Sequence, residues 1–252
     1  MPPEPWSTAR SGRGRGDTVR APVPQGRVSS LADAVRALRP LLSAQGLALG
    51  LAGTEETALL PGGPAERGLA RCMGAARRQE FLAGRWALRR ALDAVGCPAP
   101  DISYEGRRPK VPDRTVASLT HSGGTAVALA ARRDTCRTVG VDLELHQLPL
   151  EAAHLVLTPR EAGWLEATAA GDPAAARRLL HTVFSAKEAV FKALAALPGG
   201  AASPRTLRDI AVRPVPHGFE AWQHGQAGPV LRTRVRWVAG AVLCWTVLPA
   251  AG

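Results

Sequence analysis

The chain has 252 residues, 46% of them hydrophobic, so it can form one large domain or two small ones around a real core. Its formal net charge is +11, but only three of the 32 basic residues are lysines. No apolar run reaches the roughly 18 residues that a membrane span needs, and the Pro-, Arg- and Gly-rich start lacks the apolar region of a secretory signal. The composition indicates a globular protein without a membrane span. It leaves open whether the charge is compositional drift or serves an anionic partner.

The four cysteines are far apart in the sequence and include no C-x-x-C pair; they are Cys72, Cys97, Cys136 and Cys244. This spacing argues against a zinc site or a disulfide framework and fits a reducing cytoplasm. We therefore predict a cytoplasmic protein whose cysteines pack in the core.

The first half of the chain predicts a disordered tail followed by helices and a strand. Residues 1–28 are rich in Arg, Pro and Gly and hold nothing that could form a core. A capping-box pattern at Ser30 predicts a helix that ends at Pro40. A short strand is expected over 47–51. Apolar residues at helical spacing predict a longer helix over 75–95.

Strand patterns dominate the middle and the end of the chain. Residues 126–131 and 138–145 are short alternating runs that predict a half-buried sheet. Near the C-terminus, 230–238 and 241–247 flank Ala239-Gly240 and predict a hairpin.

Two helix starts lie between these strands. Thr158-Pro159-Arg160-Glu161 combines an N-cap, a first-turn proline and a glutamate at the third position. Asp172-Pro173 begins a second helix, expected to end at Gly199-Gly200. Helices and strands mix without strict βαβ alternation, which predicts an α+β fold with mostly antiparallel sheet.

The segment Gly140-Val141-Asp142-Leu143-Glu144 carries the most specific chemistry. Residues two apart on a strand share a face, so Asp142 and Glu144 present two carboxylates side by side. Two adjacent anions near apolar surface favour a cation, and an all-oxygen pair suits Mg²⁺ better than zinc. The alternative is an exposed strand face with two solvated acids.

The helix that follows Asp172 carries a polar stripe on a largely apolar background. His181, Ser185, Glu188 and Lys192 fall within roughly 60° of arc. A solvated salt-bridge stripe would look similar. However, two of the three lysines lie in this helix, and a compact ammonium suits a single phosphate oxygen.

A third polar element, Thr120-His121-Ser122, precedes the glycine pair Gly123-Gly124. Its imidazole could donate to a phosphate, and the glycines would let a ligand approach the backbone. Two basic clusters, Arg77-Arg78 and Arg107-Arg108-Pro109, are less specific.

Together these segments resemble the 4′-phosphopantetheinyl transferase superfamily. The family pattern G-[VI]-D-x-E is matched by residues 140–144, and W/F-x-x-K-E-[AS]-x-x-K is matched by 184–192, with Phe184 where Trp is common. Thr120-His121-Ser122 resembles the [ST]-H-[SC] element, and Arg108-Pro109 resembles a basic residue–Pro element. Residues 80–85 resemble a helix of the enterobactin-synthetase-activating branch.

The resemblance implies a fold of two similar α+β lobes, a pseudo-dimer with coenzyme A between them. We place the N-terminal lobe at 29–134 and the C-terminal lobe, with the metal and catalytic motifs, at 135–252. It also implies a reaction: the 4′-phosphopantetheine arm of coenzyme A moves to a serine of an apo carrier protein, releasing adenosine 3′,5′-bisphosphate. A monomer is expected by the same analogy.

The resemblance also implies residue roles. Mg²⁺ would be held by Asp142, Glu144 and Glu188, with Glu188 deprotonating the serine. Lys192 and the Thr120-His121 pair would hold the pyrophosphate. Three arginines, Arg78, Arg85 and Arg108, would bind the 3′-phosphate or adenosine end of coenzyme A. The sequence does not decide whether Arg78 or its neighbour Arg77 makes this contact. A positive surface would steer an acidic carrier protein, and the composition leans toward secondary metabolism.

Three other functions remain open. The charge and the Arg-rich tail would suit a nucleic-acid-binding module, although only 4% of residues are aromatic and could stack on bases. A different Mg²⁺-dependent phosphoryl-transfer enzyme would share the carboxylates but needs a nucleotide-binding loop, which the sequence lacks. A non-catalytic interaction protein of this fold would not need the intact acids and lysines.

Overall fold

The computed structural model describes residues 30–56, 60–105, 108–197 and 203–250. Two parts of the sequence analysis therefore lie outside the described residues: the disordered tail, and Arg107 of one basic cluster. The helix end expected at Gly199-Gly200 is wrong, because the helix that follows Asp172 already ends at Ala195. Within the described residues the chain forms two large antiparallel sheets, a small two-stranded ladder and several helices, which confirms the predicted α+β class.

The N-terminal lobe is built on a three-stranded sheet in the order β1-β5-β4. Its strands are β1 (Ala48–Gly53), β4 (Thr115–Ser122) and β5 (Thr125–Arg132). A two-residue turn of Gly123 and Gly124 joins β4 to β5, and both glycines have positive φ, as a type I′ hairpin requires. A separate two-stranded ladder joins β2 (Tyr104–Glu105) to β3 (Arg108–Pro109).

The C-terminal lobe carries a five-stranded sheet in the order β6-β10-β9-β8-β7. Its strands are β6 (Cys136–Glu144), β7 (Ile210–Val215), β8 (Gly218–Gln223), β9 (Leu231–Val238) and β10 (Ala241–Pro249). The predicted hairpin is confirmed, because β9 and β10 pair around Ala239 and Gly240, both at positive φ.

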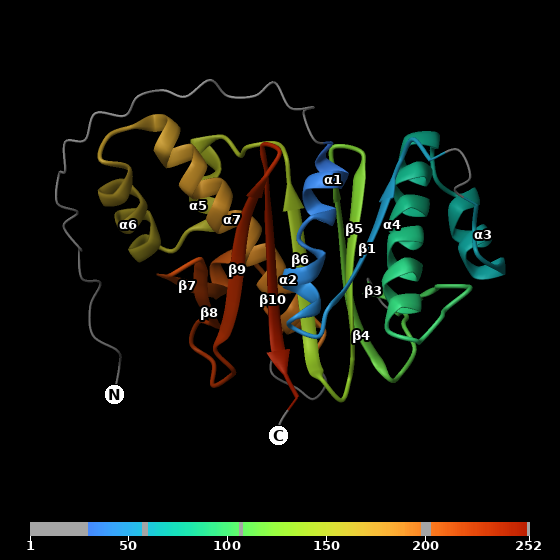
Figure 1. The fold of residues 1–252 in the computed structure, drawn as a ribbon. Helices are drawn as coiled ribbons and strands as arrows, with labels where there is room; N and C mark the ends of the chain where they lie inside the picture. Colours follow the sequence, from blue (N-terminus) through green and yellow to red (C-terminus); the bar gives the residue numbers. More distant parts are fainter. Residues whose placement is uncertain (1–29, 57–59, 106–107, 198–202, 251–252) are drawn as a thin grey trace, which may run out of the picture.

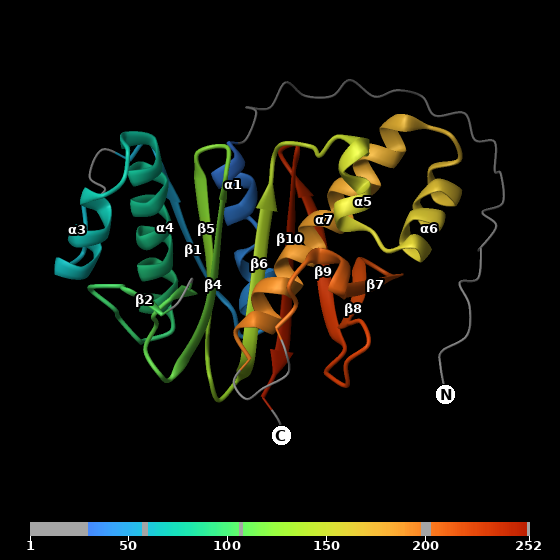
Figure 2. The ribbon, with the colours of Figure 1, turned by 180° about the vertical axis from the view of Figure 1, so that it is seen from behind.

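One long helix covers the outer face of each sheet (Figures 1 and 2). Helix α4 (Ala75–Ala94) packs on the first sheet, and α7 (Pro173–Ala195) packs on the second. The shorter helices are α1 (Leu31–Arg36), α2 (Arg39–Ser43), α3 (Pro64–Arg71), α5 (Ala153–Val156) and α6 (Pro159–Ala169), with 3-10 turns at Leu150–Ala152 and Leu207–Asp209.

The helix starts read from the sequence are mostly confirmed. Ser30 caps α1 through the Asp33 amide, and Thr158 forms the expected capping box with Glu161. The single helix expected from Ser30 to Pro40 is wrong. Helix α1 ends at Arg36, and Pro40 lies in the first turn of α2, where its missing N–H costs nothing.

Several elements were missed. Residues 115–122 form β4, a strand that the sequence analysis did not predict. Helix α3 and the hairpin of β7 and β8 also escaped prediction. Helix α3 has only eight residues, and β7 holds Pro214, both of which weaken a local pattern.

A glycine in each lobe lets the long helix approach the sheet closely. A Cβ on Gly50 of β1 would lie 1.9 Å from the Ala87 carbonyl oxygen of α4. A Cβ on Gly140 of β6 would lie 1.8 Å from the Ala189 carbonyl oxygen of α7. Because no side chain fits there, helix and strand backbones are in direct contact in both lobes.

A buried glutamate fixes a short helix in each lobe as well. Glu66 of α3 and Glu161 of α6 both stand third in their helices after a proline at the first position. Glu66 accepts from Arg89 of α4 and from the Ile102 amide. Glu161 accepts from Lys187 of α7 and from the Val212 amide. Both lobes thus pair a short helix, anchored by a buried glutamate, with a long helix that packs on a sheet, although the sequence shows no visible repeat.

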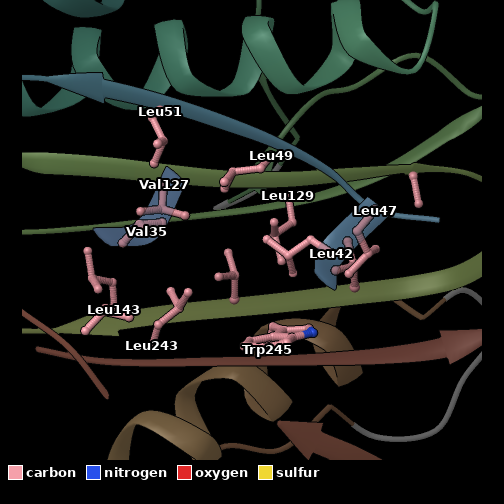
Figure 3. Packing of buried hydrophobic residues seen from close by; sticks show 14 of the residues in the cluster. Val35, Leu42, Leu47, Leu49, Leu51, Val127, Leu129, Leu143, Leu243 and Trp245 are labelled. Atoms are coloured by element: carbon pink, nitrogen blue, oxygen red, sulfur yellow. The ribbon is translucent and has the colours of Figure 1, made fainter. Parts of the chain in front are cut away.

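The two sheets face one another across a shared core (Figure 3). Leu49, Leu51, Val127 and Leu129 from the first sheet meet Leu143, Leu243 and Trp245 from the second, and Val35 and Leu42 of α1 and α2 close the layer. Trp245 is fully buried and donates its indole N–H to the Gln45 side chain at 3.2 Å. The lobes therefore share apolar surface rather than merely touching.

Hydroxyl groups join the sheets along their neighbouring edges, β4 and β6. The backbone amides of Val141, Leu143 and Leu145 donate to the hydroxyls of Ser118, Thr120 and Ser122 at 3.1, 3.3 and 3.0 Å. Each bond joins residues 23 apart, so the two strands run parallel. Side-chain oxygens thus satisfy amides that would otherwise be unpaired at a sheet edge.

Candidate active site

The site forms where α7 crosses β6 beside β4. Gly140, Asp142 and Glu144 alternate along β6 and turn toward α7, because successive side chains of a strand point to opposite faces. The opposite set, Val141 and Leu143, enters the shared core. The glycine therefore brings α7 close enough for its polar stripe to meet the acids.

Asp142 and Lys192 form the central ion pair. Asp142 is 2% exposed, and the Lys192 ammonium donates to its Oδ1 at 2.7 Å and to the Val141 carbonyl at 3.1 Å. The Thr120 hydroxyl also donates to Oδ1, at 3.2 Å. Strand β6, strand β4 and helix α7 thus each supply one residue, and both lobes contribute.

The second oxygen of Asp142 has no partner. Its Oδ2 is buried and lacks a hydrogen bond within the described residues. Such an atom is costly unless something pairs with it. An orphaned carboxylate oxygen beside further acids fits a bound cation.

The surroundings of the neighbouring acids, Glu144 and Glu188, disfavour their ionised form. Burial raises the pKa of Glu144 to about 7, and the charges of Asp142 and Glu188 add to the effect against the opposing pull of Lys192. Burial also raises the pKa of Glu188, again with Asp142 contributing. The charge of one ammonium, that of Lys192, is therefore set against three carboxylates. A bound divalent cation would offset the remaining repulsion between them.

The predicted metal ligands do not form a ready-made cage. Within the described ranges, no three His, Cys, Asp or Glu side chains converge closely enough to hold a metal ion. Mg²⁺ usually binds through one or two carboxylates, waters and substrate phosphates rather than a full protein cage. The donor set of Asp142, Glu144 and Glu188 is therefore chemically suited to Mg²⁺ that arrives with a phosphorylated substrate.

Thr120 and His121 point to opposite faces of β4, although the sequence grouped them as one element. Thr120 faces Asp142, whereas the His121 Nε2 lies 3.3 Å from Nη1 of Arg77 on α4. Burial lowers the pKa of His121, with Glu80 opposing and Arg77 adding to the shift. The imidazole therefore favours its neutral form at the rim of the site.

Two of the predicted arginine ligands, Arg78 and Arg108, are exposed, and it is Arg77 that contacts His121. The Arg77 guanidinium contacts both His121 and Glu80, while Arg78 is exposed. Arg108 is exposed on β3, in the small ladder with β2. The sequence could not separate Arg77 from Arg78, because adjacent helical residues differ only in direction by about 100°.

Arg85 is buried within the N-terminal lobe. It is 2% exposed, donates to the Ile102 carbonyl at 3.1 Å, and stacks against the rings of Phe81 and Tyr104. No described residue bonds its Nη2, and burial lowers the pKa of the guanidinium. None of its described contacts reaches the acids of β6.

His181 and Ser185, the N-terminal part of the polar stripe on α7, are buried next to the site. His181 is fully buried, and its Nε2 lies 3.1 Å from the Glu144 carbonyl oxygen. Ser185 is also fully buried, and neither its hydroxyl nor the His181 Nδ1 has a partner in the part of the chain described. The Trp237 ring covers His181 on one side and Arg178 stacks on that ring at 3.8 Å.

Lys187 takes no part in the site, although it lies in the same motif. It is fully buried and donates to Glu161 at 2.6 Å and to the Val156 carbonyl at 2.8 Å. Helix spacing turns it away from Lys192, onto the face that meets α5 and α6. Within one motif, one lysine is structural and the other faces the acids.

Fold and site define a two-lobed α+β protein with an acid–lysine centre under α7, where the edges of its two large sheets meet. Two family models match it: the 4′-phosphopantetheinyl transferase N-terminal domain over residues 65–131, and the 4′-phosphopantetheinyl transferase superfamily over residues 138–232. Two relatives are both 4′-phosphopantetheinyl transferases. Svp of Streptomyces mobaraensis is 36% identical over 69% of this chain and 73% of its own, and PptT of Mycobacterium tuberculosis is 40% identical over 47% of this chain and 52% of its own.

The chain belongs to the 4′-phosphopantetheinyl transferase superfamily. A further relative, enterobactin synthase component D of Salmonella typhi, is 36% identical over 51% of this chain. The chain spans about half the length of several curated relatives that it matches, namely 52% to 57% for three of the first four. Among the described residues no helix is both long and apolar enough to cross a membrane.

Proposed function

We propose that this protein moves the 4′-phosphopantetheine arm of coenzyme A onto a serine hydroxyl of an apo carrier protein, in a Mg²⁺-dependent reaction that releases adenosine 3′,5′-bisphosphate. Family membership supports the transfer, because the relatives that match are named for it. The observation that carries the Mg²⁺ requirement is the unpartnered Oδ2 of Asp142 among acids whose charges repel.

The acids would hold the cation between protein and pyrophosphate. Asp142, Glu144 and Glu188 supply hard oxygen donors, and bound Mg²⁺ would stabilise negative charge on the leaving phosphate. Before substrate binds, Lys192 neutralises Asp142. Its side chain is 29% exposed, so its ammonium can also meet a phosphate oxygen from the same position.

Glu188 is the candidate for removing the serine proton. Burial raises the pKa of its carboxylate, and a base with a raised pKa takes a proton more readily near neutral pH. Its place on rigid α7, one turn before Lys192, keeps the base beside the ammonium.

Coenzyme A would enter from the His121 side. Neutral His121 can donate a hydrogen bond to the pyrophosphate, and Arg77 beside it supplies positive charge. Arg78 and Arg108 are exposed and available to the 3′-phosphate or adenosine end. A direct ionic role for Arg85 would require movement, since its guanidinium is buried between aromatic rings.

The partner would be an acidic carrier protein. The formal charge of +11 would steer it, which favours rapid encounter at low salt. We further propose that the enzyme is a monomer and serves secondary metabolism. We place it in the cytoplasm, because its four free cysteines fit reducing conditions.

Intact-mass spectrometry of apo carrier proteins tests this function. The carrier is incubated with the protein, coenzyme A and Mg²⁺, and we expect the mass to rise by one phosphopantetheine group. Glu188→Gln should abolish the gain, and so should a chelator. Glu166→Gln, an exposed change on α6, is the matched control and should leave the gain intact.

Two results would contradict the proposal. No mass gain with apo carriers of the fatty-acid, polyketide and peptide-synthetase classes, from protein shown to be folded, would remove the transfer itself. A full gain in the presence of chelator would remove the Mg²⁺ requirement. Salt-sensitive binding to generic DNA without any mass gain would favour the nucleic-acid alternative.

A further inference from the structure

A groove runs along the free edge of β1, away from the acids of β6. It has a volume of about 570 Å³ and is lined by residues of α1, α2, β1 and α4. Figure 1 shows β1 between the two short helices α1 and α2 and the long helix α4. Residues 46–51 form its floor, and three arginines line it: Arg36, Arg39 and Arg90. We call it the β1 groove.

The floor offers unpaired strand backbone. Even-numbered residues of β1 bond to β5, as the Thr54 amide does to Gly124, so the amides and carbonyls of Leu49 and Leu51 face outward. Arg90 takes the Leu51 carbonyl, and Glu56 takes the Gly53 amide. Among the described residues, nothing is recorded as pairing with the Leu49 amide or carbonyl or with the Leu51 amide.

The other edges of the two large sheets offer less free backbone. Strands β4 and β6 are joined by the three hydroxyl bridges. On β7 the outward Val212 amide is capped by Glu161, and Pro214 two residues later has no N–H to offer. Within the described ranges, an incoming strand therefore finds more outward amides on β1 than on β7.

The charge around the groove selects for acidic side chains. Among the described residues, no aspartate or glutamate lines it. Arg36 and Arg90 are paired with Asp33 and Glu56, whereas Arg39 is exposed and its side chain forms no hydrogen bond or ion pair within the described ranges. The side chains of Leu49 and Leu51 point into the shared core (Figure 3), so a ligand meets backbone and arginine there.

We propose that the β1 groove binds an extended acidic peptide segment of a partner protein, which adds to the first sheet as a fourth strand. Its carbonyls accept from the Leu49 and Leu51 amides, and one of its amides donates to the Leu49 carbonyl. Alternate carboxylates meet Arg39 and Arg36. Backbone pairing supplies affinity, and the arginines select the acidic sequence. This docking surface does not depend on phosphopantetheine transfer.

A labelled peptide tests the proposal on the full chain. The probe is an octapeptide of alternating glutamate and valine with blocked ends and a neutral dye, followed by fluorescence anisotropy. We expect saturable binding that weakens with salt. Arg39→Glu should weaken binding by about tenfold through charge reversal. Arg71→Glu, which changes an exposed arginine on α3, is the matched control and should not weaken binding.

Two further peptides separate strand addition from simple charge attraction. One is N-methylated at every second residue, which keeps its charge but removes the donors needed for pairing, and the other carries lysine for glutamate. Neither should bind. Hydrogen exchange should show the Leu49 and Leu51 amides protected only when the acidic peptide is added.

Four results would overturn the proposal. These are the absence of binding, equal binding of the N-methylated peptide, equal loss with Arg71→Glu, or slow exchange of the Leu49 and Leu51 amides in the free protein. The last result would mean that another segment of the chain, or a second copy, already fills the groove.

Discussion

Lys187 and Lys192 lie five residues apart on α7 and meet different acids. Lys187 is fully buried against Glu161, while Lys192 reaches Asp142 and is partly open to solvent. The sequence placed both in one motif and could not tell their roles apart. Their surroundings make them a matched pair, because the same substitution removes a structural contact in one case and a site contact in the other.

Lys187→Met should lower the free energy of unfolding by about 3–5 kcal/mol, because Glu161 would be left as a buried, unpaired charge. Lys192→Met should reduce transfer by about 100-fold, because the ammonium that meets the phosphate is lost. It should also destabilise the metal-free protein, because the buried Asp142 carboxylate loses its partner, and Mg²⁺ should restore part of that loss. Chemical denaturation and the carrier mass assay measure the two effects. If the two variants lost the same activity and had the same stability, the assignment of a structural role to Lys187 and a site role to Lys192 would be contradicted.

Glu144 predicts a dependence of stability on pH. Its pKa is raised from 4.5 to about 7 by burial and by the neighbouring acids. A raised folded-state pKa means that this group's contribution to stability is fully present below pH 4.5 and lost as pH rises through about 7. The melting temperature of metal-free protein should therefore fall over that window, and Mg²⁺ should restore it at higher pH.

Differential scanning calorimetry with and without chelator measures this dependence. Glu144→Gln removes the titrating group and should flatten the fall in melting temperature. If the variant shows the same slope as the parent, another group carries the effect. Transfer activity should rise over the same window, because the ionised carboxylate is the form that binds a cation.

At the scale of elements, the contact between β6 and α7 decides the site. Gly140 belongs to the same motif as Asp142 and Glu144, and its lack of a side chain lets α7 lie against the strand. The glycine therefore sets the distance between the acids and Lys192, although it carries no functional group.

Gly140→Ala should lower the free energy of unfolding by about 3 kcal/mol, since its Cβ would overlap the Ala189 carbonyl, and it should also reduce transfer activity. Gly50→Ala creates the same overlap in the other lobe, so it should cost similar stability. Gly163→Ala on exposed α6 meets open space and should be neutral or raise stability by about 0.5–1 kcal/mol. Thermal and urea unfolding compare the three. A stable, fully active Gly140→Ala would contradict the close packing.

At the scale of the whole molecule, the lobes should unfold together. The core between the sheets contains residues from both, and hydroxyls of β4 satisfy amides of β6. Separating the lobes would expose apolar surface and leave buried amides unpaired, which is costly. The two lobes are therefore one cooperative unit.

Trp245→Ala should lower the free energy of unfolding by about 3–5 kcal/mol, because this fully buried ring lies between the sheets. Unfolding followed by circular dichroism and by fluorescence of the remaining tryptophans should stay coincident. Two separated transitions, in the parent or the variant, would show that the lobes fold independently.

The sequence by itself determined the α+β class, most helix starts, the C-terminal hairpin and the alternation that puts Asp142 and Glu144 on one face. These follow from local rules of capping, turns and periodicity, which act within a few residues. The hydroxyl alternation of Ser118, Thr120 and Ser122 was also a local strand signal, but its meaning depended on a partner strand.

Tertiary structure alone decided which groups meet. It separated Thr120 from His121, turned Lys187 away from Lys192, brought Arg77 rather than Arg78 to the imidazole and buried Arg85. Among the described residues, it also left the Leu49 and Leu51 amides of β1 open while Glu161 capped the Val212 amide of β7. Each outcome depends on contacts between residues distant in sequence, where packing and desolvation override local preference, and no local pattern encodes them.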